Sequence, residues 1–351
     1  MEGRSIRISD IARKAEVSSA TVSRVINDSA YVAPATRRKV ERAMHALHYR
    51  PNLVARSLAT RESRTIGLMI PHIRSPFFAG LASGVEERAE ELGYAVFLCD
   101  TRESAESERR VLEVLASRRV DGIIATPVGR ESRYFVEIAS SVPVVFAARH
   151  FPEIPICSVV VDNAAGSRRI IQHLLDIGHR RIGVINGPYF LSTGLERWAG
   201  VRQAFDEFGV DLDPKLVKEG DFTAQGGYQM ARTLLQRSPR PTALYAANHM
   251  MLAGCIRAVS EKGLLIPDDM AIAGFEGFRD TGFDYLVSVP ITVNEHPTHE
   301  MAVSAVNLLI EQIQGVRSGN PVTSRRVVLK TKLAVSAPTT RKRSAGGKPK
   351  K

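Results

Sequence analysis

Cysteine is scarce in this chain of 351 residues, which has three thiols and no paired Cys spacing. Cys99, Cys157 and Cys255 each lie in an apolar run, so we expect reduced core residues rather than disulfides or metal ligands. No segment reaches the ~18 consecutive apolar residues of a transmembrane helix, and the N-terminus lacks the apolar stretch of a secretory signal. These absences predict a soluble protein that stays in the cytoplasm.

Metal-binding and catalytic motifs are also missing. His173, His179, His296 and His299 have no Cys or acidic residue at a convincing ligand spacing, so we expect surface or capping residues and no metal. We find no phosphate-binding Gly-Lys loop, no Gly-x-Ser-x-Gly elbow and no dinucleotide fingerprint, since residues 183–187 contain too little glycine. An α/β enzyme is therefore disfavoured, and no cofactor is predicted.

Positive charge is concentrated at the two ends of the chain. The net charge is +11, yet residues 1–62 hold twelve Lys and Arg against six Asp and Glu, and residues 341–351 hold six basic residues and no acid. A basic head predicts salt-dependent attraction to nucleic-acid phosphates. For residues 337–351 we expect a basic, disordered tail, with a solubilising role favoured over an auxiliary DNA contact.

Two short helices separated by a tight turn are predicted within residues 8–26. Ser9 is a possible N-cap of the first helix and Ser18 of the second. The apolar face of the first helix consists of Ile8, Ile11, Ala12 and Ala15. The second helix buries Val22, Val25 and Ile26 and exposes Ser19, Ala20, Ser23 and Arg24. The pair fits an ordinary amphipathic hairpin or a helix-turn-helix, whose second helix enters the DNA major groove by its N-terminal end.

A third helix and the segment after it decide between these alternatives. The third helix is expected to start at Pro34, a residue suited to a first turn, and to close a three-helix core. Over residues 17–27, the helix start at Thr36 and Arg37, and residues 49–58, the chain closely resembles the LacI family of bacterial transcription regulators. The resemblance implies a helix-turn-helix DNA-binding domain over residues 1–50 and a hinge helix with linker over residues 51–62.

The helix pair and the resemblance together give a set of expected DNA contacts. Leu58 would wedge into the minor groove and kink the duplex, at a cost that wider contacts offset. Glu16 stands where the family usually has a small turn residue, so we expect a slightly strained turn. The expected DNA-binding residues are Ser18, Ser19, Ala20, Thr21, Ser23, Arg24, Asn27, Tyr31, Thr36, Asn52, Ala55 and Leu58.

From residue 65 onward, apolar strands alternate with amphipathic helices. We expect strands at 65–70, 95–99, 122–126, 144–147 and 158–161, and helices near 77–92, 104–117 and 134–140. The alternation repeats, with strands at 182–186, 216–219, 243–247 and 270–275 and helices near 166–177, 196–208, 226–236 and 250–263. Strands that are apolar throughout predict parallel sheets covered on both faces, and hence two doubly wound α/β lobes.

The resemblance extends to about residue 333 and implies a periplasmic-binding-protein-like arrangement of an effector-binding and dimerisation core, residues 63–336. Lobe one would comprise about 63–161 and 294–323, and lobe two about 162–291 and 324–336, with crossovers near 161–163, 291–294 and 323–326. A ligand would bind between the lobes, which is also where the carboxyl ends of the strands collect binding groups.

An effector site follows from the resemblance, position by position. Arg197 matches an arginine that forks onto ligand oxygens, as a planar bidentate donor can. His249, Glu276 and Glu295 depart from the usual acid, Asp and Gln, so no particular family ligand is implied. Plain alternatives are core packing for the phenylalanines, a surface ion pair for Arg197 and a capping or surface role for His249. The expected effector-binding residues are Phe77, Phe78, Arg197, Phe222, Asn248, His249, Glu276 and Glu295.

These features predict a sequence-specific transcription regulator, most simply a repressor, that binds a palindromic double-stranded DNA operator as a homodimer. A small molecule between the lobes would control operator affinity. Family frequency favours a sugar or sugar acid, with a nucleobase or a phosphoprotein partner as alternatives. A solute-binding protein with the same core is disfavoured by the basic head and the missing signal. The expected location is cytoplasmic, associated with the nucleoid.

Overall fold

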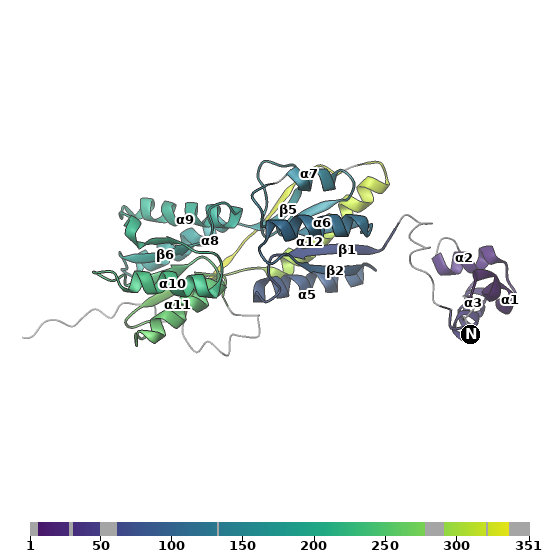
Figure 1. Cartoon of the computed structure of the whole chain (residues 1–351), viewed down its shortest axis with the longest axis horizontal. Coiled ribbons are helices and arrows are strands. Elements are labelled where there is room, and N and C mark those ends of the chain that lie inside the picture. Colours follow the sequence, from purple (N-terminus) through teal and green to yellow (C-terminus); the bar gives the residue numbers. More distant parts are fainter. Residues whose placement is uncertain are drawn as a thin grey trace, which may run out of the picture. The chain divides into compact units, whose positions relative to one another are not determined.

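The computed structural model of the chain describes residues 6–27, 31–49, 62–131, 133–277, 291–320 and 322–336. The chain divides into two compact units, Met1–Arg64 and Thr65–Lys351 (Figure 1). The expected tail, 337–351, and nearly all of the expected hinge, 51–62, lie outside the described residues. In the part of the chain that is described, no helix is long and apolar enough to cross a membrane.

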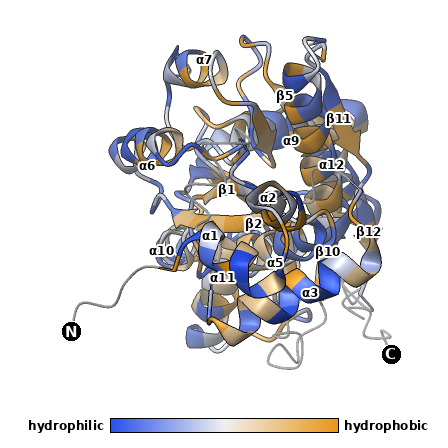
Figure 2. Cartoon of the chain, turned by 90° about the vertical axis from the view of Figure 1, so that its right-hand side faces the viewer, coloured by the Kyte–Doolittle hydropathy of each residue, from blue (hydrophilic) through white to orange (hydrophobic). Residues whose placement is uncertain are grey.

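The N-terminal unit is a three-helix head. It comprises α1 (Ile8–Ala15), α2 (Ser19–Asn27) and α3 (Pro34–Ala46), with Pro34 as the first residue of α3 as predicted. The helices mix hydrophilic and hydrophobic residues (Figure 2), and their apolar sides meet in one small core. That core consists of Ile11, Ala12, Ala15, Val22, Val25, Val40 and Ala43.

Local contacts explain where the first two helices begin. Ser9 is not a cap, because α1 starts one residue earlier and the Asp10 carboxylate accepts the Arg7 N–H at 3.0 Å. Ile8 is correspondingly exposed rather than part of the apolar face. The Ser18 cap is confirmed, since its Oγ accepts the Thr21 N–H at 3.1 Å. Glu16 sits between the helices at φ 56°, the left-handed conformation that strains a residue with a side chain.

Lobe one is a six-stranded parallel sheet in the order β11-β5-β4-β3-β1-β2. Its strands are β1 (Thr65–Ile70), β2 (Ala95–Asp100), β3 (Gly122–Ala125), β4 (Val144–Ala147), β5 (Cys157–Val161) and β11 (Arg326–Leu329). Its helices are α5 (Pro76–Glu91), α6 (Ala105–Ser117), α7 (Arg133–Ala139) and α12 (Thr298–Arg317). Ile66 and Leu68 of β1 pack with the α5 and α12 side, whereas Met69 packs with the α6 and α7 side. The sheet is therefore covered on both faces, as its apolar strands predict.

Lobe two is a second six-stranded sheet in the order β12-β10-β9-β8-β6-β7, parallel except for the β10–β12 pair. Its strands are β6 (Ile182–Asn186), β7 (Val217–Glu219), β8 (Ala243–Ala246), β9 (Ala271–Phe275), β10 (Thr292–Glu295) and β12 (Lys332–Ala334). Its helices are α8 (Asn163–Asp176), α9 (Ser192–Phe208), α10 (Ala224–Leu235) and α11 (His249–Glu261), with a short 3-10 turn at Pro214–Leu216. Helix α8 packs on α9 and α10 packs on α11.

Two of the expected crossovers are misplaced. Strand β10 lies in lobe two and α12 in lobe one, so the second crossover follows residue 295 instead of falling at 291–294. Strand β11 pairs with β5, so residues 326–329 belong to lobe one and the third crossover lies at 330–331. The short edge strand β11 begins with the charged Arg326 and has three apolar residues after it. It is therefore shorter than the continuous apolar run that marks a central strand, and it is exposed at Arg326 and Val328.

Gly200 brings α8 and α9 unusually close together. A Cβ at this position would lie 2.0 Å from the carbonyl oxygen of Ala164, so only glycine allows this approach. The close contact sets the first turn of α8, which carries Asn163, beside Arg197 of α9. Both side chains belong to the site described next.

Candidate functional site

The exposed face of α2 carries the side chains expected to meet DNA. Ser18, Ser19, Ala20 and Arg24 are exposed, and Thr21, Ser23 and Thr36 are partly exposed. Tyr31, before α3, is 89% exposed and therefore accessible to DNA. The Asn27 side chain, Asn52, Ala55 and Leu58 lie outside the described residues.

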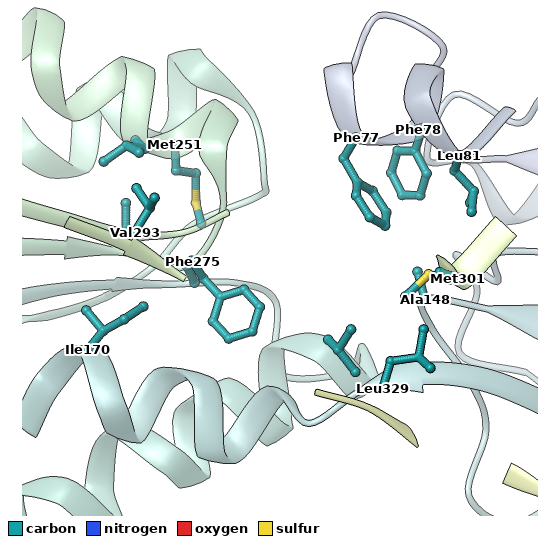
Figure 3. Packing of buried hydrophobic residues seen from close by; sticks show 14 of the residues in the cluster. Phe77, Phe78, Leu81, Ala148, Ile170, Met251, Phe275, Val293, Met301 and Leu329 are labelled. Atoms are coloured by element: carbon teal, nitrogen blue, oxygen red, sulfur yellow. The ribbon is translucent and has the colours of Figure 1, made fainter. Parts of the chain in front are cut away.

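A small cavity lies between the two lobes. Lobe one contributes Phe77 and Phe78 from the first turn of α5, and Phe275 of β9 lies on the opposite side (Figure 3). Seven of the eight expected effector residues line this cavity: Phe77, Phe78, Arg197, Phe222, Asn248, His249 and Glu276. Glu295 does not; it lines a larger neighbouring opening of about 1170 Å³ that shares Phe77 and Glu276 with the cavity.

Arg197 is the anchor of the cavity. It is 3% exposed, so the alternative of a surface ion pair is wrong. Its Nε donates to Asn163 Oδ1 at 3.0 Å, one terminal nitrogen donates to the Ala247 carbonyl, and the other donates to Glu276 Oε1 at 3.1 Å. The guanidinium carbon also lies 3.8 Å from the centroid of the Phe275 ring, a close cation–π contact.

Glu276 is a buried carboxylate surrounded by three nitrogen groups. Besides Arg197, it contacts His249 Nδ1 at 2.5 Å and His296 Nε2 at 3.6 Å. Burial alone would raise the pKa of Glu276, but Arg197 and the two imidazoles outweigh burial and hold that pKa well below its ordinary range. Glu276 therefore stays ionised and neutralises Arg197 inside the cavity.

The two histidines are core components of the site rather than surface residues. His249 is buried, and its Nε2 lies 3.3 Å from Ser75 Oγ in lobe one, so a Ser75–His249–Glu276 chain joins the lobes. Burial lowers the pKa of His296 to about 4, with Glu276 only partly opposing the shift. The surface role expected for His296 is wrong, as it is for His179, which is buried against Thr242.

Three residues that line the cavity have left-handed backbone conformations. Ala148 has φ 66°, Phe222 has φ 62° and Glu276 has φ 69°, and each follows the end of a strand. Such conformations cost about 1–3 kcal/mol each outside glycine and persist where the surrounding structure imposes them, typically at functional sites. Three of the six such non-glycine residues among the described residues of the core thus line this one cavity.

Arg149 also lines the cavity, and the sequence analysis did not predict it. It lies two residues after the end of β4, and because ligands bind beyond the carboxyl ends of parallel strands, this position could have identified it. Its guanidinium donates two bonds of 2.9 Å to Glu103 and lies 5.5 Å from the Phe222 ring centroid in lobe two. Like Arg197, Arg149 is already paired with a carboxylate.

Two buried polar atoms of the cavity lining have no hydrogen-bond partner within the described residues. They are Thr193 Oγ1 and His296 Nδ1. A buried polar atom without a partner is costly, so a ligand that supplied one would be stabilised there. Asn248 makes two bonds within the protein: Oδ1 caps α11 by accepting the Met251 N–H at 2.9 Å, and Nδ2 donates to the Phe222 carbonyl at 3.1 Å.

No group of three or more His, Cys, Asp or Glu among the described residues could hold a metal ion. The thiols are free; Cys157 and Cys255 are buried, and Cys99 is partly exposed on β2. The site therefore consists of arginine–carboxylate pairs, neutral imidazole and aromatic rings. This chemistry suits the binding of a polar organic molecule.

Comparison with known proteins agrees with both units. Residues 7–52 match the family described as bacterial regulatory proteins, lacI family, and residues 63–333 match periplasmic binding proteins and sugar binding domain of LacI family. The HTH-type transcriptional repressor PurR of Haemophilus influenzae (strain PittEE) is 34% identical over 309 residues, 87% of this chain and 90% of that protein.

Two solved structures extend the likeness over nearly the whole chain. The lac repressor dimer bound to operator and the anti-inducer ONPF has a TM-score of 0.81 at 27% identity, covering 96% of this chain and 100% of that one. A complex of the transcriptional regulator CelR with cellobiose has a TM-score of 0.70 at 32% identity, covering 94% and 99%. The chain belongs to the LacI family of bacterial regulatory proteins, DNA-binding transcriptional repressors with a helix-turn-helix head and a periplasmic-binding-protein-like core, and it is a regulator rather than an enzyme.

Proposed function

We propose that this protein is a repressor whose operator affinity is controlled by a small polar molecule bound between the two lobes. The observation that carries the proposal is the buried Arg197–Glu276–His249 network, which continues to Ser75 across the lobe boundary. A ligand that contacts this network contacts both lobes at once. It can therefore favour one arrangement of the lobes, and a ligand shifts an equilibrium only by such differential contact.

The lining favours a neutral sugar over a sugar acid. Phe77, Phe78 and Phe222 offer apolar faces, while Thr193 and His296 offer unpaired polar atoms. Both arginines are already neutralised, Arg149 by Glu103 and Arg197 by Glu276. A sugar acid would have to compete with Glu276 for Arg197, whereas a neutral polyol brings no charge into a buried site. Cellobiose in the CelR complex is an example of such a ligand in a relative.

A thermal-shift screen of neutral sugars, sugar acids and nucleobases against the full chain tests the ligand class. A compound that binds the folded state alone raises the unfolding midpoint through linkage. We expect the hits to be neutral sugars and to lose their effect in Thr193→Val. Hits confined to sugar acids or nucleobases would overturn the proposed class.

We further propose a homodimer that places two heads on a palindromic operator, as the lac repressor dimer does in its operator complex. The hinge, with Asn52, Ala55 and Leu58, would bind the minor groove at the centre of the operator. Because bacterial operators lie in the cytoplasm, this is the proposed location of the protein.

Arg24→Ala should relax specificity at one base position of the operator. Arg24 is exposed on α2 within the face expected to enter the major groove. Loss of a bidentate contact to guanine would cost about 1–3 kcal/mol at that position. Gel shifts on operators substituted base by base measure this. An equal loss on every sequence would make Arg24 a phosphate contact, and Arg13→Ala, on α1 and paired with Asp10 at 3.2 Å, is the control.

Leu58→Ala should weaken operator binding and reduce DNA bending while leaving effector affinity intact. The reason is that an apolar wedge unstacks one base step and bends the duplex, and the wider protein–DNA contacts that follow offset the cost of unstacking. Circular-permutation gels report the bend angle directly. Unchanged bending would remove Leu58 from the account of the hinge.

A further inference from the structure

Arg130 of lobe one and Phe190 of lobe two meet across the lobe boundary. Arg130 lies between β3 and α7, Phe190 lies between β6 and α9, and the guanidinium carbon is 4.4 Å from the ring centroid. Phe190 is 44% exposed, so one part of its ring meets solvent while the guanidinium lies over its face. The pair is thus an interlobe contact at the surface, separate from the buried Arg197–Glu276 network.

The lobe-one side of this contact is held by a buried acid. Glu108 of α6 is fully buried and accepts the N–H groups of Val128 at 2.6 Å and Gly129 at 3.1 Å, as well as the Tyr134 hydroxyl. These bonds fix the backbone immediately before Arg130. A surface arginine usually loses much side-chain entropy on forming a contact, and a fixed backbone reduces the part of that cost that comes from the loop.

The lobe-two side is anchored as well. The Tyr189 N–H donates to Glu219 Oε1 at 3.1 Å, and the Tyr189 ring packs edge-to-face on Trp198 with centroids 5.9 Å apart. Two residues beyond Phe190, Ser192 Oγ accepts the His150 N–H of lobe one at 3.2 Å. A second interlobe contact therefore lies directly beside the first.

The position of the pair connects it with the cavity. Arg130 and Phe190 line a surface opening together with Glu103. The Glu103 carboxylate holds Arg149, which forms a wall of the interlobe cavity. The Arg130–Phe190 contact thus spans the lobes on the outer side of the Arg149–Glu103 pair.

We propose that Arg130 and Phe190 form a latch across the lobe boundary, which holds the lobes closed and opens when they separate. The latch rests on the proposed function only in that an effector is what would bind between the lobes that it holds together. Closure itself is a property of the chain without any ligand. The two ideas can therefore fail separately.

Hydrogen–deuterium exchange of the His150 amide in the full chain, without ligand, tests the latch. This amide is bonded to Ser192 across the boundary, so its exchange reports lobe opening. An exposed cation–π contact predicts about two- to fivefold faster exchange in Arg130→Ala and in Phe190→Ala. In the double variant the effect should equal that of one variant, because both remove the same contact. Acrylamide quenching of the chain's single tryptophan, Trp198, should rise in parallel.

Arg109→Ala is the matched control, since Arg109 lines the same opening but pairs within its own helix, with Glu113 at 3.9 Å. Exchange of the His150 amide in Arg109→Ala should equal that in the unaltered chain. In Arg130→Lys, which keeps a cation, its rate should lie between those of the unaltered chain and Arg130→Ala. Unchanged His150 exchange in Arg130→Ala would overturn the latch. So would additive effects in the double variant, because they would mean that the two residues act separately.

Discussion

Arg197→Ala is expected to lower the free energy of unfolding of the core by about 3–5 kcal/mol, the range for removing one partner of a buried ion pair. The loss would leave Glu276 buried beside two imidazoles without its guanidinium, and would also free Asn163 and the Ala247 carbonyl. Urea unfolding at neutral pH measures the change. Arg168→Ala, which breaks an exposed 2.8 Å pair with Glu207, should cost no more than about 1 kcal/mol.

The same variant should show a distinctive pH dependence. Arg197 helps to hold the pKa of Glu276 below its ordinary value, so the ionised pair stabilises the fold above the unfolded pKa of about 4.3 and loses that contribution as pH falls. The stability difference between Arg197→Ala and the unaltered chain should therefore narrow on acidification. A difference that stays constant with pH would contradict the ion-pair account.

Effector binding should suffer in Arg197→Ala while operator binding persists. Loss of a charged hydrogen bond in a closed site predicts an affinity lower by about 2–4 kcal/mol for a ligand that contacts Arg197. The head contains none of the cavity residues, so the ligand-free variant should still shift operator DNA. Calorimetry with a hit from the screen measures the first effect. Unaltered ligand affinity would mean that the ligand does not contact Arg197.

Phe97→Asp is expected to convert the protein to a monomer and to weaken operator binding about a hundredfold or more, since specific sites of this kind are read by two heads. Strand β2 ends its sheet, and Phe97 and Leu98 are 47% and 46% exposed. The colouring of β2 in Figure 2 shows the hydrophobic character of this strand. A parallel sheet rarely leaves such an edge uncovered, so a second copy of the chain is the expected cover.

Sedimentation equilibrium distinguishes the dimer from the 38.5 kDa chain. Val114→Asp is the control, because Val114 is similarly exposed on α6 of the same lobe but does not lie on the free edge. The control should sediment and bind DNA as the unaltered chain does. A dimeric Phe97→Asp would place the subunit contact elsewhere.

Periodicity was sufficient to predict the elements whose burial is regular. The apolar runs of β1 and β4 and the proline at the start of α3 predict the observed starts of these elements, because a core strand and a helix N-terminus impose strict local requirements. Edge strands do not impose such local requirements. Strand β11 is short and half exposed, and its place beside β5 depends on a parallel pairing between residues far apart in the chain. Local sequence carries no signal for such a pairing.

The same limit applies to the site. Phe77 and Glu276 could be placed at the cavity from sequence because the family resemblance assigned their positions. Ser75, Thr193 and His296 could not be placed there from sequence. Ser75 and His296 contact side chains from distant segments, and Thr193 and His296 each have a buried polar atom without a hydrogen-bond partner. Asn248 lines the cavity as expected, and its amide oxygen also caps α11, which the sequence did not predict.

The central claim is that occupation of the interlobe cavity changes the operator affinity of the head. Its most direct test is operator binding by the full chain, measured at fixed salt with and without a ligand found in the screen, beside Arg197→Ala. We predict that the ligand shifts the operator Kd of the unaltered chain by about 5- to 150-fold, the usual range of allosteric coupling, and leaves that of Arg197→Ala unmoved. A ligand that binds the unaltered chain tightly, yet leaves its operator Kd unchanged, would contradict the account.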